Sequence, residues 1–258
     1  RIDINTNGYR LQHGDCLMEK ELKKIVENRY TIGEVLYFNK AKTWTSFDLV
    51  NKVRYLIRKE LGVKKLKIGH AGTLDPLATG VMIVCTGKAT KRIESFQYQT
   101  KEYIATLKLG ATTPSFDLET EVDATYPTEH ITEELLRTTL KQFIGEIQQI
   151  PPKYSAVKIN GKRAYEYARN GEEIEIKPKT LVIDEIELLE FHDLIAKIRV
   201  VCSKGTYIRA LARDIGEALN SGAHLTDLER TRIGDITLDT CMSINDFQNI
   251  INNEKTKL

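Results

Sequence analysis

The 258-residue chain lacks the features that mark several classes of protein. Its four cysteines are widely spaced and form no C-x-x-C pair, so neither a disulfide framework nor a zinc site is expected. No apolar run approaches the roughly 20 residues that cross a bilayer. No secretory signal is visible either, and we therefore expect a cytoplasmic protein with no membrane association.

Motifs for common cofactors are also missing. The chain contains neither the G-x-x-x-x-G-K-[ST] loop of nucleotide-hydrolysing enzymes nor the G-x-G-x-x-G of dinucleotide binders. The formal net charge is only +2, so total charge alone indicates no partner. We expect no cofactor and no metal. Nothing indicates a coiled coil, and a monomer is the default expectation.

The charges are instead segregated along the chain. Residues 51–67 carry seven Lys or Arg against one Glu, residues 153–169 carry five against one, and residues 115–134 carry seven Asp or Glu without a single Lys or Arg. One basic run is most often a solvated helix face. The second run also interleaves tyrosines with its cations, and such mixtures suit phosphates and unstacked bases.

Apolar periodicity predicts a mixed succession of elements. Helices are expected over residues 45–62, 132–147 and 205–220, and strands over 33–39, 81–85, 102–110, 180–191 and 195–202. Thr45 is expected to cap the first helix with Asp48 three residues later, and Gly62 to end it. The inward side chains of the second helix are expected to be Leu135, Leu136, Leu140, Phe143 and Ile144. This order predicts an α+β protein around a central sheet.

The densest stretch is KIGHAGTLDPLATGVM, which places Asp75 in a glycine-rich loop before an apolar strand. An Asp before Pro commonly begins a turn, which is the simplest interpretation of the local pattern. Pro76, however, biases Asp75 toward an extended backbone. Three glycines permit conformations that side chains forbid: Gly69, Gly72 and Gly80. A carboxylate on such a stiff loop is typical of a positioned nucleophile or base.

The same stretch resembles the catalytic motif of the bacterial tRNA pseudouridine-55 synthases, the TruB-type family. KEYIATLKLG, IPPKYSAVKINGKRAYEYAR and VVCSKGTYIRALARDIGEAL are similar, in that order, to the family's second motif, RNA-gripping segment and third motif. The resemblance covers about residues 33–245. It implies the pseudouridine synthase fold, with a central mixed, largely antiparallel sheet flanked by helices.

The resemblance also implies a domain organisation. Residues 31–258 would form the catalytic domain, with an RNA-gripping insertion near residues 150–178 and no C-terminal PUA domain. Residues 1–30 would be an N-terminal extension or a segment introduced by cloning.

By the same resemblance, the chain would isomerise uridine 55 in the T-arm of tRNA to pseudouridine, without a cofactor or an obligate protein partner. Asp75 would be the catalytic carboxylate, acting on the ribose of a flipped nucleotide by attack or by proton removal. Arg209 would pair with Asp75, and Tyr103 would be the active-site tyrosine. Without the resemblance, Arg209 is most simply a surface arginine of a helix.

Further residues would bind the substrate. Tyr103 and Tyr207 would wall the base pocket beside Leu228, although Tyr103 and Leu228 also suit a plain core. His70 would fill the space that the flipped uridine leaves in the RNA, although a lone His could be structural or a general base. Lys67 would meet a phosphate. Contacts to the RNA backbone are assigned to the gripping segment: Lys158, Lys162, Arg163 and Arg169.

The sequence departs from the family at two places. Lys40 is followed by Ala41 where the family usually has Pro, and the loop TTPSFDLET keeps Asp117 but lacks the family's glycine. Two alternatives stay open: a non-catalytic RNA-binding or tRNA-folding protein on the same scaffold, and a pseudouridine synthase acting on other T-loop-like RNAs. The presence of both Asp75 and Arg209 favours an enzyme.

Overall fold

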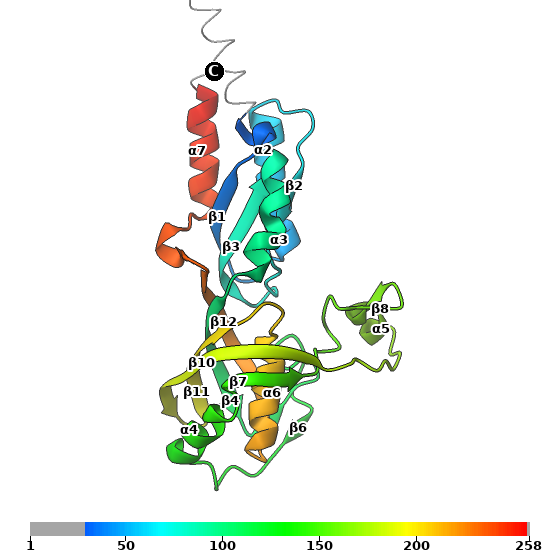
Figure 1. The fold of residues 1–258 in the computed structure, drawn as a ribbon, viewed down its shortest axis with the longest axis vertical. Coiled ribbons are helices and arrows are strands. Elements are labelled where there is room, and N and C mark those ends of the chain that lie inside the picture. The colour runs from blue at the N-terminus through cyan, green and yellow to red at the C-terminus, as the bar shows by residue number, and fades with distance from the viewer. Residues whose placement is uncertain (1–28, 257–258) are drawn as a thin grey trace, which may run out of the picture.

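The computed structural model describes residues 29–256, so the prediction for the N-terminal segment falls almost entirely outside the described residues. One mixed sheet runs through the elongated molecule (Figure 1). In spatial order its main strands are β1 (Val35–Lys40), β3 (Thr79–Thr86), β12 (Ala223–Ile233), β4 (Lys101–Leu109), β11 (Ile195–Cys202), β10 (Lys179–His192) and β7 (Gly145–Gln149). Two short strands join at its sides: β2 (Ile68–His70) pairs with β3, and β13 (Ile236–Thr237) with β12.

The pairing of the strands confirms a mixed, largely antiparallel sheet. Among the described strands of this sheet, only β12 and β3 run parallel, with Glu229 opposite Thr79 and Arg230 opposite Gly80. The other pairs are antiparallel. The α+β architecture expected from the order of elements is therefore present.

Two lobes meet where β12 lies beside β3 (Figure 1). The upper lobe contains β1 to β3. Helices α2 (Ser46–Glu60) and α7 (Ile244–Thr256) cover one face of these strands, and α3 (Ile93–Tyr98), which follows the 3-10 turn η1 (Gly87–Arg92), covers the other. The lower lobe packs α4 (Glu133–Lys141) and α6 (Ile208–Ala218) on one face of β4, β10, β11 and β12, around its own apolar core.

Smaller elements decorate this frame. The hairpin of β5 (Ala111–Thr112) and β6 (Ala124–Thr125) belongs to the lower lobe. An arm carrying β8 (Lys158–Ile159), β9 (Lys162–Arg163) and α5 (Ala164–Arg169) projects to one side of the molecule (Figure 1). The 3-10 turn η2 (Leu238–Thr240) connects β13 to the segment before α7.

Helix α2 begins and ends as its sequence predicts. Thr45 is the N-cap, and its hydroxyl accepts the backbone N–H of Asp48 at 3.0 Å while the Asp48 carboxylate accepts the N–H of Thr45 at 2.9 Å. Such a reciprocal capping box satisfies two otherwise unpaired donors. Gly62 follows the helix with a φ of +72°, a conformation that suits glycine at a helix end.

The prediction of one helix over residues 132–147 is wrong in its second half. Helix α4 ends at Lys141, and Gly145, with a φ of +100°, begins strand β7, which pairs with β10. Leu136 and Leu140 are buried as expected, but Leu135 and Ile144 are 36% and 46% exposed. Pairing with a strand over thirty residues away overrides the helical periodicity of this segment.

The junction between the lobes requires a close backbone approach. Gly80, the second residue of β3, has a φ of +112°, and a Cβ at this position would lie 2.2 Å from the carbonyl oxygen of Arg230. Only glycine fits both the conformation and the space. This contact holds the loop of residues 71–78 against β12, which is where the candidate site lies.

Candidate active site

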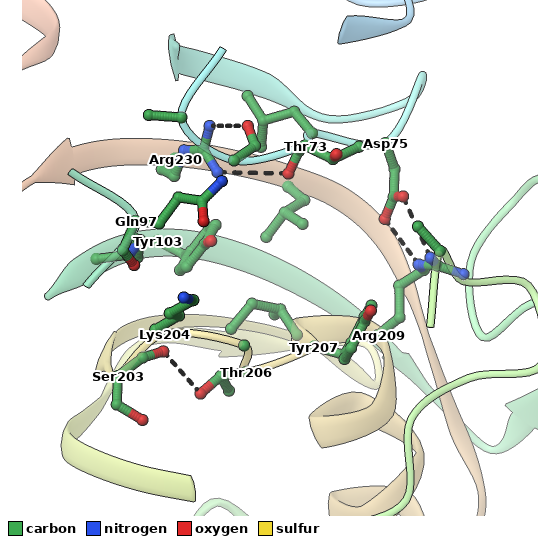
Figure 2. Close-up of a pocket in the computed structure, with 18 residues that line it drawn as sticks. Thr73, Asp75, Gln97, Tyr103, Ser203, Lys204, Thr206, Tyr207, Arg209 and Arg230 are labelled. Carbon is green, nitrogen blue, oxygen red and sulfur yellow. Dashed lines mark hydrogen bonds and ion pairs between the residues drawn. The ribbon is translucent and has the colours of Figure 1, made fainter. Parts of the chain in front are cut away.

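A cavity of about 250 Å³ lies at the junction of the lobes (Figure 2). It is lined by the loop before β3, by β4 and β12, and by the segment that leads into α6. The structure brings five of the predicted site residues together in its walls: Asp75, Tyr103, Tyr207, Arg209 and Leu228.

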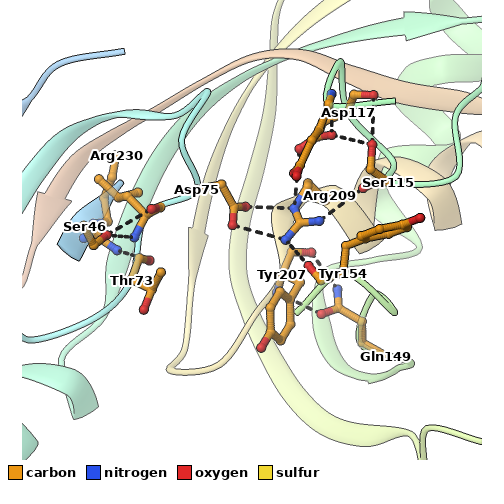
Figure 3. Close-up of polar contacts among 12 residues, drawn as sticks. Ser46, Thr73, Asp75, Ser115, Asp117, Gln149, Tyr154, Tyr207, Arg209 and Arg230 are labelled. Carbon is orange, nitrogen blue, oxygen red and sulfur yellow. Dashed lines mark hydrogen bonds and ion pairs between the residues drawn. The ribbon is translucent and has the colours of Figure 1, made fainter. Parts of the chain in front are cut away.

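Asp75 and Arg209 form a two-pronged ion pair at this cavity (Figure 3). The Nε of Arg209 donates to Oδ2 of Asp75 at 2.8 Å, and its Nη2 donates to Oδ1 at 3.2 Å. The side chain of Arg209 is 4% exposed and that of Asp75 is 34% exposed. The carboxylate therefore faces the cavity while the guanidinium is held behind it, and the interpretation of Arg209 as a surface residue is excluded.

The other donors of Arg209 are also engaged. Nη1 donates to the carbonyl of Ser115 at 3.2 Å, and Nη2 donates to the carbonyl of Tyr154 at 2.9 Å. A guanidinium with this many partners cannot rotate without breaking several hydrogen bonds. Its position, and with it the direction of the Asp75 carboxylate, is set by three separate segments of the chain.

Asp117 is a second carboxylate near this guanidinium that the sequence did not single out as a site residue. Its Oδ2 lies 3.8 Å from the Nε of Arg209, and the side chain is 8% exposed. Its Oδ1 accepts the hydroxyl of Ser115 at 2.6 Å and the N–H of Glu119 at 2.9 Å. The available signal was that Asp117 is the acid kept in the TTPSFDLET loop, but only the fold shows that it faces Arg209.

Tyr103, Leu228 and Tyr207 form apolar walls of the cavity. Tyr103 is 8% exposed and belongs to the lower-lobe core, so it is both core and cavity lining. Burial raises the pKa of the Tyr103 hydroxyl, and the same cause raises the pKa of Tyr207. Both rings are therefore neutral at physiological pH and can lie flat against an uncharged base.

The loop that carries Asp75 is held by side chains from both lobes (Figure 3). The buried guanidinium of Arg230 donates to the carbonyls of Val81 at 2.8 Å and Gly72 at 3.2 Å. The hydroxyl of Ser46 donates to the carbonyl of Leu74 at 3.0 Å and accepts its N–H at 2.8 Å. The loop is therefore stiff because of tertiary contacts, beyond the effects of its glycines and proline.

Lys40 lies beneath the same loop and is fully buried. Its ammonium donates to the carbonyls of Trp44 at 2.6 Å and Ala41 at 3.0 Å. Burial lowers the pKa of Lys40 to about 8, and the charge of Asp75 acts in the opposite direction. The absence of the family's proline after Lys40 leaves these carbonyl contacts in place.

His70 and Lys67 do not line the cavity. His70 is half-buried on β2, its Nδ1 is buried without a hydrogen-bond partner among the described residues, and burial lowers the pKa of its imidazole. Lys67 is exposed just before β2. Both residues are close in sequence to the residues that line the cavity, but they are not part of its walls.

The four predicted backbone-binding cations lie together on the arm. Lys158 is on β8, Lys162 and Arg163 are on β9, and Arg169 ends α5. They are exposed, and three of them stand over tyrosine rings: Lys162 over Tyr167 at 5.7 Å, and Arg163 and Arg169 over Tyr165 at 6.0 and 5.3 Å. Since Ala156 lines the cavity, the arm begins at the site itself.

Two features are absent from the described residues. No group of three or more His, Cys, Asp or Glu side chains in residues 29–256 is arranged to hold a metal ion. Within the same part of the chain, no helix has the length and apolar character needed to cross a bilayer.

Comparisons with known proteins cover most of the chain. The model of the TruB family pseudouridylate synthase N-terminal domain matches residues 58–208, and that of the tRNA pseudouridylate synthase B C-terminal domain matches residues 209–258. The tRNA pseudouridine synthase B of Parabacteroides distasonis is 72% identical over 233 residues, covering 88% of this chain and 99% of that protein. The protein of the same name from Flavobacterium johnsoniae is 54% identical over 220 residues, covering 85% and 96%.

Solved structures show the same fold. A chain in the crystal structure of a Cbf5-Nop10-Gar1 complex matches with a TM-score of 0.63 at 30% identity, covering 87% of this chain. This chain spans 56% of the length of that chain. Asp75 lies in the segment matched by the first family model and Arg209 in the segment matched by the second, so the ion pair joins the two. The chain belongs to the TruB family of pseudouridylate synthases, which are isomerases.

Proposed function

We propose that the protein isomerises uridine 55 in the T-arm of tRNA to pseudouridine, as a cytoplasmic monomer that needs no protein partner. The observation that carries the proposal is the carboxylate of Asp75, partly exposed in a nucleoside-sized cavity and aimed by the buried Arg209. The names of the relatives, tRNA pseudouridine synthase B, support tRNA as the substrate.

The reaction rearranges bonds within one nucleotide. The N1–C1′ bond breaks, the base turns, and a C5–C1′ bond forms; the hydrogen on C5 leaves to solvent and N1 takes up a proton. The product is an isomer, so the reaction itself consumes no redox equivalent and no energy donor. Asp75 acts on the ribose, either by attack on C1′ or by removal of a ribose proton. Both routes use the carboxylate that the guanidinium of Arg209 holds in place.

The uracil ring must leave the RNA stack to reach Asp75. Extruding a base costs a few kcal/mol, which stacking on a protein ring offsets in part. The ring of Tyr103 and the side chains of Tyr207 and Leu228 supply the apolar surface that receives it. His70, which lies on β2 outside the cavity walls, fills the space that the uridine leaves in the RNA.

The exposed cations hold the RNA around this cavity. The arm, near residues 150–178, contributes Lys158, Lys162, Arg163 and Arg169 to the RNA backbone, and the exposed Lys67 contributes from the segment before β2. Contacts of this kind release counterions, so binding weakens steeply as salt rises. Neutralising one arm cation should weaken binding for all RNA sequences alike and reduce the slope of log K against log salt by about 1.

The test is tritium release from unmodified tRNA that carries 5-tritiated uridine, since the C5 hydrogen is lost when the new bond forms. The parent protein should release one tritium per tRNA, Asp75→Asn should release none while still binding, and replacing uridine 55 by cytidine should abolish release. Binding without release by the parent protein would favour the RNA-folding alternative. Release that persists without uridine 55 would favour another RNA target.

A further inference from the structure

The cavity extends away from Asp75 to residues that the proposed function leaves without a role. Its far end is formed by the turn between α3 and β4 and by the loop before α6 (Figure 2). Gln97, Lys101, Ser203 and Lys204 line this end. None of these four residues takes part in the ion pair or in the apolar walls described above.

Most polar groups at the far end are engaged within the protein. The hydroxyl of Ser203 accepts the N–H of Val182 at 3.0 Å, and the hydroxyl of Thr206 donates to the carbonyl of Ser203 at 3.0 Å. The ammonium of Lys101 donates to the carbonyls of Gln97 and Gln99. These groups are therefore held in place by partners within the protein.

Two polar groups there are free. Within residues 29–256, neither the side-chain amide of Gln97 nor the ammonium of Lys204 makes a hydrogen bond or an ion pair. The ammonium of Lys204 instead stands 3.7 Å from the centre of the Tyr98 ring. A cation held over a ring keeps its charge available to a further anionic partner, because the ring does not neutralise it.

Tyr98 is the most unusual residue of this group because its ring is largely open to solvent. It ends α3 beside the cavity-lining Gln97, and it is 66% exposed. With Lys204 on one side, most of the remaining ring surface faces water. An exposed ring next to a free cation and a free amide matches the chemistry of a nucleotide: a base to stack, a phosphate to neutralise and polar base edges to bond.

We propose that Tyr98, Lys204 and Gln97 form a subsite for a nucleotide that adjoins the target uridine in the RNA chain. The base of that nucleotide stacks on Tyr98, the ammonium of Lys204 binds its phosphate, and the amide of Gln97 bonds its base edge. The subsite rests on the proposed function, because extruding the target uridine deprives its neighbour of a stacking partner that Tyr98 then replaces. The comparisons assign no role to these three residues.

The test is a binding cycle with a T-arm stem–loop RNA, in an Asp75→Asn background so that no turnover occurs. Tyr98→Leu should weaken binding about 5- to 150-fold, the value of one stacked base. Tyr98→Phe, which keeps the ring, should bind within about twofold of the parent, as a matched control. Lys204→Met should lower both affinity and the salt slope, and the slope should fall by about 1.

The decisive arm of the cycle uses RNAs with one abasic nucleotide on either side of the target uridine. For the parent, one of these abasic RNAs should bind about 5- to 150-fold more weakly than the intact RNA. For Tyr98→Leu, the same abasic RNA should bind no more weakly than the intact RNA. Equal losses for parent and Tyr98→Leu at both positions, or unchanged binding by Tyr98→Leu, would overturn the subsite. If the coupling between Tyr98 and one abasic position were found, but the protein with its native Asp75 did not isomerise uridine, the proposed function alone would be refuted. If the protein did not bind the RNA at all, both the proposed function and the subsite would be refuted.

Discussion

The guanidinium of Arg209 grips both carboxylate oxygens of Asp75, although 134 residues separate the two along the chain. The arginine is buried and saturated with acceptors, whereas the aspartate is open to the cavity. The main effect of the ion pair is therefore to fix the direction of the Asp75 carboxylate, and its contribution to stability is secondary.

The first prediction concerns the geometry of this ion pair. Arg209→Lys keeps the charge but loses the planar fork, so the carboxylate loses its fixed direction. We expect kcat for tritium release to fall roughly 100-fold, the cost of misplacing a reacting group by about 1 Å. RNA affinity should change little, because Arg209 lies behind Asp75. Arg213→Lys, one turn later on α6 and paired with Asp214, is the control and should keep kcat. Equal activities for the two variants would contradict the prediction.

The second prediction concerns Gln149, a fully buried side chain at the base of the arm. Its Oε1 accepts the N–H of Tyr207 at 2.9 Å and its Nε2 donates to the carbonyl of Tyr207 at 3.2 Å. Gln149→Leu leaves the Tyr207 N–H buried without this partner, which costs about 1–3 kcal/mol of stability. It also frees the segment that carries Tyr207 and Arg209, so kcat per folded molecule should fall at least about tenfold.

Gln148→Leu is the matched control, since Gln148 neighbours Gln149 on β7 and bonds only the exposed Thr180. It should leave kcat and the melting temperature close to those of the parent. If Gln149→Leu lowered the melting temperature yet kept kcat per folded molecule, Gln149 would be a structural residue and not a positioning one.

The third prediction concerns the contact between the lobes. In Gly80→Ala the new Cβ would lie 2.2 Å from the Arg230 carbonyl at a φ of +112°. In the control Gly145→Ala the φ is a similar +100°, but nothing lies within 4 Å. The control isolates the backbone cost, about 1–2 kcal/mol. We expect Gly80→Ala to lose at least a further 1–3 kcal/mol through overpacking, measured by urea unfolding. Similar losses of unfolding free energy in the two variants would show that β3 and β12 can move apart at this contact without further cost.

The fourth prediction uses the depressed pKa of Lys40, about 8 in the folded protein against 10.5 for a free lysine. Between these values the unfolded chain holds a proton that the folded protein has released, so the free energy of unfolding should rise with pH. Below about pH 8 both states are protonated and the slope vanishes. Lys40→Met should remove an increment on the order of 3 kcal/mol at most.

Unfolding by urea between about pH 8 and pH 10 measures that increment. Lys101 is buried with a pKa of about 8 from the same cause, so Lys40→Met should keep part of the slope. The exposed Lys141→Met is the control and should follow the parent. Superimposable pH profiles for Lys40→Met and the parent would refute the assignment.

Local patterns predicted much of the fold because they act within a few residues. The capping box of Thr45 and Asp48 is legible in the sequence and appears in the structure, and the strand expected over residues 102–110 is found as β4. The end of α4 was not legible, because pairing of β7 with β10 decided it. The roles of Tyr98, Gln149 and Asp117 were equally hidden, since each depends on a partner brought in from another segment.

The sequence by itself determined which groups were available: one carboxylate on a glycine-rich loop, one arginine near the start of a helix, and tyrosines interleaved with cations. Only the tertiary structure decided which of them meet. Strand β12 lies between β3 and β4, and Arg230 on it binds the loop of Asp75 while α6 presents Arg209 from the opposite side. The physical reason is that a side chain's direction follows from its element, but its neighbours follow from the order of strands across the sheet, which no short stretch of sequence encodes.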